Sequence, residues 1–268
     1  MENIIDYYSL FDEWGRLDRE PLEFIINWHY IKKYLPPHGN VFDNGAGPGK
    51  YSMELAKLGF NVTLSDLTPR LVEIAKEKAS ELGLTEHFNG FHVLNAINLD
   101  GLPNEVFDAT LMLGPLYHLQ REEERINAVK ELFRVTKKDG IIFVAFQSRI
   151  RMTITSLQFP QHWKPNDTMD SIKEFRDTGI FNHVDKGRFT GAYYFNIIDI
   201  KPFMESQGFE TVDLIGSSSI GGLISNEQRQ SWEEKGESQS LMNLLIELAK
   251  DPSVLGISSH LLYIGRKK

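Results

Sequence analysis

Three glycines stand at alternate positions in one short segment of the sequence, at Gly45, Gly47 and Gly49. The segment follows the apolar run 40–44 and precedes a stretch with helical periodicity. Without β-carbons at these positions, the backbone can approach a ligand closely. The dinucleotide fingerprint G-x-G-x-x-G would need a glycine where this chain has Lys50. The segment therefore favours a site for a nucleoside with a compact tail over a site for a pyrophosphate.

A carboxylate ends the next β-type run, where Asp66 lies near the end of segment 61–67. In a doubly wound sheet this position faces the crevice beside the first strand, and a carboxylate there can accept hydrogen bonds from both hydroxyls of a ribose. A glycine turn is often only a turn, and an acidic strand end is often only solvated. The two features occur in register on consecutive strands, however, and together they predict a nucleoside site.

The glycine segment and Asp66 would form one site only if strands and helices alternate along the chain and bring them to the same edge of a sheet. Strands are predicted over 40–44, 61–67, 91–96, 107–114 and 140–147. Helices are predicted over 50–58, 69–82 and 122–135, with a turn at 137–140. Pro69 suits the first turn of its helix, with Thr68 as the N-cap. The alternation predicts the α/β class, with a doubly wound, mostly parallel, seven-stranded Rossmann-like sheet.

The rest of the chain adds segments around this core. Residues 1–38 are predicted as a helical cap, and 39–148 as the cofactor-binding half. Residues 149–200, rich in aromatic side chains, are predicted as a substrate lid, although a second hydrophobic cluster would have the same composition. Residues 201–268 are predicted to hold strands at 208–216 and 260–268, a helix at 196–207 that begins just before them, and a helical insertion. We expect a single domain over 1–268.

Composition narrows the classes of function. The 268 residues carry a formal net charge of -8, which argues against nucleic acid as the main partner. There is no cysteine, which excludes disulfides and thiolate metal sites. No histidine spacing suits a metal, and no G-x-S-x-G or P-loop motif occurs. We expect a cytoplasmic protein without metal, signal peptide or membrane span.

Four stretches taken in order resemble a known family. They are VFDNGAGPGKYSMELAKLGFNVTLSD, LNAINL, FDATLMLGPLYHL and ERINAVKELFRVTKKDGIIFVAF. Together they look like a small-molecule class I S-adenosylmethionine-dependent methyltransferase, over about residues 38–148. The glycine segment is the most specific of the four, and the ordered set is stronger than any one member.

The resemblance implies S-adenosyl-L-methionine as the cofactor and assigns a role to each matching position. The methionine end would lie on Asp43, Gly45, Ala46, Gly47 and Gly49, and beside Leu113 and Gly114. Asp66 would bind the ribose, Leu67 would lie against the adenine, and Asn95, Ala96 and Ile97 would meet the adenine edge. The family often has an acidic residue where this chain has Asn95, and an apolar one where it has Asn44. In similar enzymes an N-terminal segment closes over the cofactor, for which Tyr8 and Arg16 are candidates.

The implied chemistry is in-line displacement of a methyl group from a sulfonium, which needs alignment and exclusion of water more than strong acids or bases. His118 and Tyr117 follow the fourth strand and are the catalytic candidates, with His118 able to take a proton. A structural role for His118 is the alternative. The acceptor is expected to be a small, largely apolar or planar molecule, with an O, N or C nucleophile left open.

Two other functions stay open. One is an NAD(P)-dependent oxidoreductase on the same kind of sheet, which Lys50 disfavours. The other is a protein that binds S-adenosylmethionine without catalysis. A protein or RNA methyltransferase is less favoured because the chain has no basic tract. The oligomeric state is left open.

Overall fold

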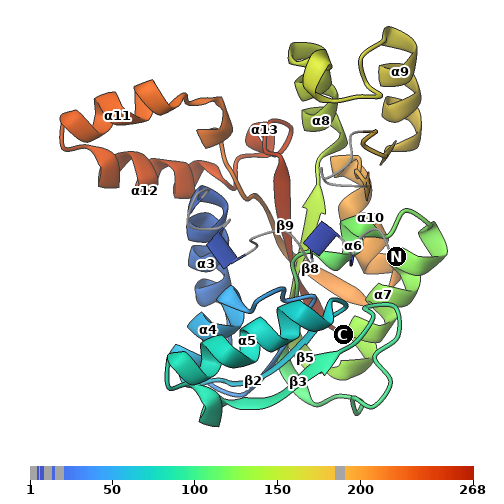
Figure 1. The fold of residues 1–268 in the computed structure, drawn as a ribbon, viewed down its shortest axis with the longest axis vertical. Helices are drawn as coiled ribbons and strands as arrows, with labels where there is room; N and C mark the ends of the chain where they lie inside the picture. The colour runs from blue at the N-terminus through green and yellow to red at the C-terminus, as the bar shows by residue number, and fades with distance from the viewer. Residues whose placement is uncertain (1–4, 6, 9–13, 16–20, 185–190) are drawn as a thin grey trace.

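A computed structural model of the chain describes residues 5, 7–8, 14–15, 21–184 and 191–268. A seven-stranded sheet in the order β3-β2-β1-β4-β5-β9-β8 forms its centre (Figure 1). The strands are β1 (Asn40–Asn44), β2 (Asn61–Asp66), β3 (Phe88–Val93), β4 (Phe107–Met112), β5 (Thr136–Gln147), β8 (Phe209–Gly216) and β9 (His260–Lys267). Neighbouring strands are parallel except at β9, which is antiparallel to both β5 and β8. The predicted fold class is confirmed.

Helices cover both faces of the sheet. On one face lie α3 (Pro21–Tyr34), α4 (Lys50–Lys57) and α5 (Pro69–Glu81), whose apolar side chains pack on β1, β2 and β4 (Figure 1). On the other face lie α7 (Glu122–Val135) and α10 (Ile197–Ser206), packed on β5, β8 and β9. The short α6 (Pro115–His118) follows β4. Burial on both faces explains why β5 reads as an almost continuous apolar run.

Two elements differ from the sequence-based prediction. The third strand is 88–93 rather than 91–96. It is the edge strand, its side chains are half-buried or exposed, and Phe88 stacks on Phe91 at 4.7 Å between ring centroids. The prediction placed the strand on the most apolar residues of this region. A strand at the edge of a sheet needs few fully buried residues, so the apolar pattern did not mark its true bounds. Leu94 and Asn95 consequently lie in the loop after the strand.

The predicted turn at 137–140 is part of β5. Phe107 pairs with Thr136, but Ala109 pairs with Ile141, so the register shifts across this segment. Asp139 has φ of +63° there, which explains why its residue types resemble a turn. Strand β5 therefore begins four residues before the predicted strand at 140.

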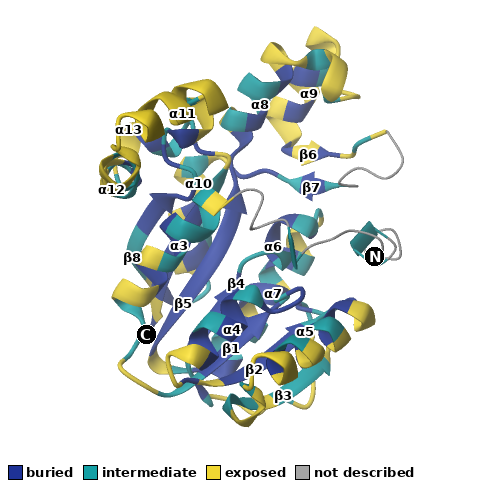
Figure 2. Ribbon diagram, turned by 60° about the vertical axis from the view of Figure 1, so that its left-hand side comes forward, coloured by how far each residue is buried: buried dark blue, intermediate teal, exposed yellow. Residues whose placement is uncertain are grey.

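The remaining elements lie outside these layers. Helices α8 (Arg149–Gln158) and α9 (Met169–Thr178) pack with the hairpin β6 (Ile180–Phe181) and β7 (Ala192–Tyr193). Helices α11 (Asn226–Glu234) and α12 (Ser238–Leu248) form an arm that extends from the body, and the short α13 (Pro252–Leu255) leads back toward β9 (Figure 1). Exposed residues concentrate on α9, α11 and α12, whereas β5 is mostly buried (Figure 2). No helix in the described ranges is long and apolar enough to cross a bilayer.

Candidate active site

A cavity of about 280 Å³ opens at the edge of the sheet where the parallel strands end. Residues at its wall follow the strand order, with Asp66 at the end of β2, Gly45–Gly47 after β1, Leu113 and Gly114 after β4, Gln147 at the end of β5, and His260 at the start of β9. This edge of a doubly wound sheet is where ligands bind. One cavity thus joins the predicted nucleoside site to residues far along the chain.

The glycine loop is held in place by backbone hydrogen bonds. The amides of Gly45 and Ala46 both donate to the Ser65 carbonyl, at 2.8 and 3.0 Å. A β-carbon on Gly45 would lie 2.1 Å from Cγ of Pro115, and one on Gly49 would lie 2.8 Å from Cδ1 of Leu64. These two glycines also have positive φ. They are therefore needed for close packing within the protein, and Gly49 does not line the cavity.

Asp66 links the glycine loop to the next strand. Its Oδ2 accepts from the Gly47 amide at 2.9 Å, and its Oδ1 accepts from the Thr68 amide at 2.8 Å. Burial raises the pKa of this carboxyl group, while the two backbone donors oppose the rise. Asp66 also lines the cavity, where a carboxylate can accept hydrogen bonds from a ligand.

Asp43 and Asn44 lie buried behind the loop. Oγ of Ser52 donates to Asp43 at 2.7 Å, and burial raises the pKa of Asp43 to about 7, with the Ser52 hydrogen bond opposing and the nearby Asp66 adding to the rise. Oδ1 of Asn44 accepts from Ser65 Oγ at 3.3 Å, and its amide nitrogen lies 3.9 Å from Sδ of Met112. Asn44 thus ties β1 to both neighbours, which gives a structural reason for a polar residue where the resemblance led us to expect an apolar one.

The loop after β3 forms the adenine side of the predicted site. Asn95 and Ala96 line the cavity, and Oδ1 of Asn95 accepts from the Ile97 amide at 3.2 Å. Ile97 itself does not line it.

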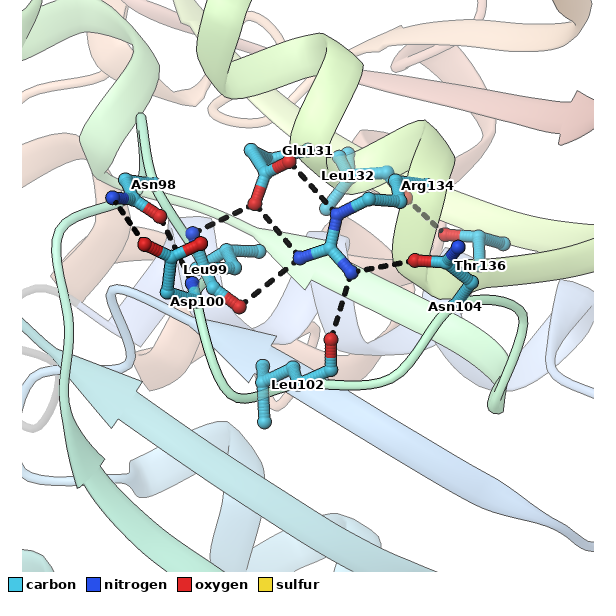
Figure 3. Close-up of polar contacts among 9 residues, drawn as sticks. All are labelled: Asn98, Leu99, Asp100, Leu102, Asn104, Glu131, Leu132, Arg134 and Thr136. Carbon is cyan, nitrogen blue, oxygen red and sulfur yellow. Dashed lines mark hydrogen bonds and ion pairs between the residues drawn. The ribbon is translucent and has the colours of Figure 1, made fainter.

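Arg134 on α7 holds the far part of that loop (Figure 3). Its guanidinium donates to the carbonyls of Leu99 and Leu102, at 3.0 and 2.7 Å, and to Oδ1 of Asn104 at 2.8 Å. Glu131 accepts from the same guanidinium and from the Leu99 amide, and the Arg134 hydrogen bond lowers the pKa of Glu131. Since both ends of the loop are fixed, Asn95 has a defined position.

His118 and Tyr117 both line the cavity, as predicted for the catalytic candidates. Nε2 of His118 lies 3.0 Å from the hydroxyl of Tyr8, and burial lowers the pKa of His118 to about 4, opposed by a backbone hydrogen bond with Gly191. The imidazole is therefore neutral at neutral pH. The hydroxyl of Tyr117 donates to the Leu113 carbonyl at 3.4 Å. Their catalytic role stays a prediction.

A second polar group at the cavity was missed by sequence reasoning. Nδ1 of His260 lies 3.3 Å from a carboxylate oxygen of Glu23, and Nε2 of His260 lies 3.3 Å from Nε2 of Gln147. All three residues line the cavity. They come from α3, β5 and β9, so no spacing in the sequence could have indicated them.

Most of the predicted site residues thus meet at one cavity. Those that line it are Tyr8, Asp43, Gly45, Ala46, Gly47, Asp66, Leu67, Asn95, Ala96, Leu113, Gly114, Tyr117 and His118. Gly49 and Ile97 lie behind it, and Arg16 lies outside the described residues. Within the described residues, no group of three His, Asp or Glu side chains could hold a metal ion.

Comparison with known proteins agrees with this fold. Residues 42–144 match a family described as methyltransferase domain. Residues 42–144 are therefore a methyltransferase domain, in agreement with the resemblance of this segment to class I S-adenosylmethionine-dependent methyltransferases, whose cofactor is S-adenosylmethionine. The oxidoreductase alternative has no support from these matches.

Curated relatives differ in what they act on. Glycine/sarcosine N-methyltransferase of Aphanothece halophytica is 31% identical over 139 residues, covering 47% of this chain and 50% of that protein. Ubiquinone biosynthesis O-methyltransferase of Haemophilus ducreyi is 34% identical and covers 41% and 45%. A tRNA (carboxymethyluridine(34)-5-O)-methyltransferase of Schizosaccharomyces pombe is also 34% identical and covers 42% and 45%. The chain thus spans about half the length of the curated relatives it matches.

Solved structures resemble the chain over most of its length. The PH0226 protein of Pyrococcus horikoshii has a TM-score of 0.65 at 16% identity and covers 98% of this chain and 99% of its own. A SAM-dependent methyltransferase of Methanosarcina mazei has a TM-score of 0.60 at 20% identity, with coverage of 89% and 96%. At these identities the likeness establishes the fold alone.

Proposed function

We propose that the protein transfers the methyl group of S-adenosylmethionine to a small-molecule acceptor. The observation that carries the proposal is a single cavity whose two ends differ in chemistry. One end has the glycine loop and buried carboxylates, and the other has the side chains of Glu23, Tyr117, His118, Gln147 and His260, on α3, α6, β5 and β9. A donor and an acceptor bound at the two ends would meet near Tyr117.

For the cofactor we propose a role for each predicted residue that the cavity brings together. Asp66 binds the ribose hydroxyls, and Leu67, Asn95 and Ala96 bind the adenine. The loop Gly45–Gly47, with Asp43 behind it, binds the methionine end together with Leu113 and Gly114. Two buried carboxylates so close together suit a ligand that carries positive charge.

The bound cofactor supplies a methyl group on a sulfonium, which an acceptor displaces in line. The chain has to align the acceptor, bind both molecules and exclude water. Tyr8 lies over this region, where its hydroxyl contacts His118. Tyr117, on α6, lines the wall between the two ends.

The acceptors named for the curated relatives include small amines and tRNA. For this chain we favour a small molecule, because the net charge is -8 and a phosphate backbone would be repelled. A cytoplasmic location is part of the proposal and rests on the absence of cysteine, which suits a reducing compartment.

Calorimetry with S-adenosylhomocysteine tests the proposal, with NAD as the control ligand. We expect S-adenosylhomocysteine to bind and NAD to give no heat of binding. Transfer is then tested with radiolabelled S-adenosylmethionine and panels of phenols, amines and unmodified tRNA. Binding without transfer to any panel would leave the non-catalytic alternative as the better description, and transfer to tRNA alone would contradict the small-molecule acceptor.

A further inference from the structure

The end of the cavity opposite the nucleoside site is built around His260. Nδ1 of its ring lies 3.3 Å from the Glu23 carboxylate, and its Nε2 lies 3.3 Å from the Gln147 amide nitrogen. The side chains of His260 and Glu23 are only 24% and 20% exposed. None of these three residues belongs to the cofactor site proposed above.

The partners of His260 fix its tautomer. A carboxylate only accepts hydrogen bonds, so the nitrogen facing Glu23 carries the proton. Nε2 of the neutral ring then carries the electron pair that can accept a hydrogen bond. The Gln147 amide nitrogen on the other side is a donor, which agrees with an acceptor at Nε2. Two contacts from different elements therefore place a basic nitrogen at the cavity.

The strand order places this nitrogen beyond the methionine end of the donor site. From β2 to β1 to β4 the cavity wall follows the proposed ribose and methionine positions, and the next two strands are β5 and β9. Tyr117 spans the boundary, because its hydroxyl donates to the Leu113 carbonyl and its ring centroid lies 5.9 Å from that of His260. An acceptor placed against His260 would thus adjoin the reacting end of the cofactor.

The other histidine at the cavity is less suited to accept a proton. His118 is buried, and its pKa is lowered to about 4. His260 has the Glu23 carboxylate beside its Nδ1. A carboxylate stabilises the imidazolium that forms when histidine accepts a proton. Among the described residues, the ionisable groups found against His260 are Glu23 on α3 and Tyr117 on α6.

We propose that Nε2 of His260 is the general base of the reaction and that the acceptor is a small hydroxyl compound of the phenol class. Glu23 is the positioning residue, which orients the ring and stabilises its protonated form. The acceptor hydroxyl replaces the Gln147 contact at Nε2, and the Gln147 amide then donates to the acceptor oxygen. This inference deepens the proposed methyl transfer and depends on it.

The hydroxyl group is selected by the donor and acceptor pattern. A hydroxyl donates one hydrogen bond and accepts others, so it can donate to His260 and accept from Gln147 at once. A protonated amine cannot accept from Gln147, and a carboxylate cannot donate to His260. The tyrosines at the cavity, Tyr7, Tyr8, Tyr51 and Tyr117, favour a flat ring.

The step balances in atoms and charge. The acceptor oxygen forms a bond to the methyl carbon while the carbon–sulfur bond breaks, and that electron pair stays on sulfur. The hydroxyl proton passes to Nε2 of His260. The products are a methyl ether, neutral S-adenosylhomocysteine sulfur and an imidazolium, so the positive charge of the sulfonium ends on the ring beside Glu23.

The test uses 4-nitrophenol as an optical probe, because its phenolate and neutral forms absorb differently. It is titrated into the protein saturated with S-adenosylhomocysteine, in a buffer in which the free probe is mostly neutral. We expect the bound probe to be largely phenolate in the wild type. In His260→Gln the bound phenolate fraction should fall at least fivefold, and in Glu23→Gln it should be intermediate. His38→Gln and Glu86→Gln, at exposed sites away from the cavity, are the matched controls and should equal the wild type.

The outcomes separate the two proposals. Calorimetry with S-adenosylhomocysteine must give the same affinity for all five proteins, which shows that the variants fold. If the wild type fails to bind S-adenosylhomocysteine, the proposed function itself is wrong. If S-adenosylhomocysteine binds but the probe stays neutral, or is equally ionised in His260→Gln, the base is not His260. If the complex binds benzylamine or benzoate but not 4-nitrophenol, the hydroxyl class is wrong.

Discussion

The two ends of the cavity are built in different ways. The proposed cofactor end comes from one continuous stretch, in which the loops after β1, β2, β3 and β4 follow one another between Asp43 and Gly114. The proposed acceptor end is assembled from Tyr8, Glu23, Gln147 and His260, which are far apart in the sequence. When neighbouring turns and strand ends form a site, its residues show a recognisable pattern in the sequence. When a site is formed only by tertiary packing, its residues show no such pattern.

The two ends also differ in electrostatics. Two buried carboxyl groups, Asp43 and Asp66, have raised pKa values at the cofactor end because burial disfavours their charged forms. His118, away from these carboxyl groups, has a lowered pKa for the same reason. The first end is suited to a cationic ligand, and the second, where Glu23 faces His260, to groups that exchange a proton. Each prediction below changes one end and measures whether the other responds.

The largest effect is expected for Asp66→Asn. The variant loses charge-assisted hydrogen bonds to the ribose, so the affinity for S-adenosylhomocysteine should fall about 30- to 150-fold, or about 2–3 kcal/mol. Calorimetry measures the loss, and Asp170→Asn on the exposed start of α9 is the control. An unchanged affinity would mean that the ribose binds elsewhere.

Arg134→Gln tests whether cofactor binding requires the loop between β3 and β4 to be anchored by a residue outside the cavity. The guanidinium makes five hydrogen bonds, three to this loop and two to Glu131 on α7 itself (Figure 3). Their loss leaves carbonyls of the loop unsatisfied, and we expect unfolding free energy to fall by about 1–3 kcal/mol and S-adenosylhomocysteine affinity to fall about 10-fold.

The control for Arg134 is Arg121→Gln, which removes only exposed ion pairs and should change stability by less than about 0.5 kcal/mol. Urea unfolding and calorimetry give the two quantities. If Arg134→Gln loses stability but keeps its full affinity for S-adenosylhomocysteine, then the Arg134 anchor does not contribute to cofactor binding.

Asp43 gives a pH dependence of stability. Its pKa is raised to about 7 in the folded protein, so between its ordinary value near 4 and about 7 the folded state binds more protons than the unfolded state. The contribution of Asp43 therefore lowers the unfolding free energy as pH rises through this window, by up to about 1.4 kcal/mol per pH unit. The difference between the wild type and Asp43→Asn, measured by urea unfolding from pH 4 to 8, isolates it. A difference that does not change with pH would contradict the raised pKa.

The smallest effect is expected for Tyr8→Phe. One neutral hydrogen bond to His118 is lost, so the affinity for S-adenosylhomocysteine should fall about 2- to 5-fold, within about 0.5–1 kcal/mol. Tyr34→Phe is the control. It loses a hydrogen bond from α3 to Asp213 on β8 and should bind S-adenosylhomocysteine with the affinity of the wild type. If Tyr8→Phe weakens binding as much as Asp66→Asn, then Tyr8 belongs to the cofactor end.

The sequence predicted the parts of the fold that depend on local pattern. The strands at 40–44 and 61–67 and the helix at 122–135 match β1, β2 and α7 to within one residue. The third strand was misplaced because an edge strand is only partly buried and lacks a strong apolar pattern. The turn at 137–140 was misread because a bulge inside a strand uses turn residues such as Asp139.

The aromatic segment 149–200 shows a limit of composition. Phe175, Phe181, Tyr194 and Trp163 pack into a hydrophobic cluster with Met152, and none of the described residues of this segment lines the cavity. Aromatic side chains serve a core and a ligand equally well, so their number does not separate the two. The interpretation of this segment as a lid stays a prediction.

Strand β9 lies between β5 and β8, although it follows both in the sequence. During synthesis on the ribosome, the outer edge of β5 therefore stays unpaired until residues 260–267 emerge, and β8 has no place in the sheet before then. That edge is apolar from Ile141 to Phe146 and would be open to pairing with other chains. The nascent protein thus passes through a stage in which it is prone to aggregation. That stage ends when β9, the strand that carries His260, pairs with β5.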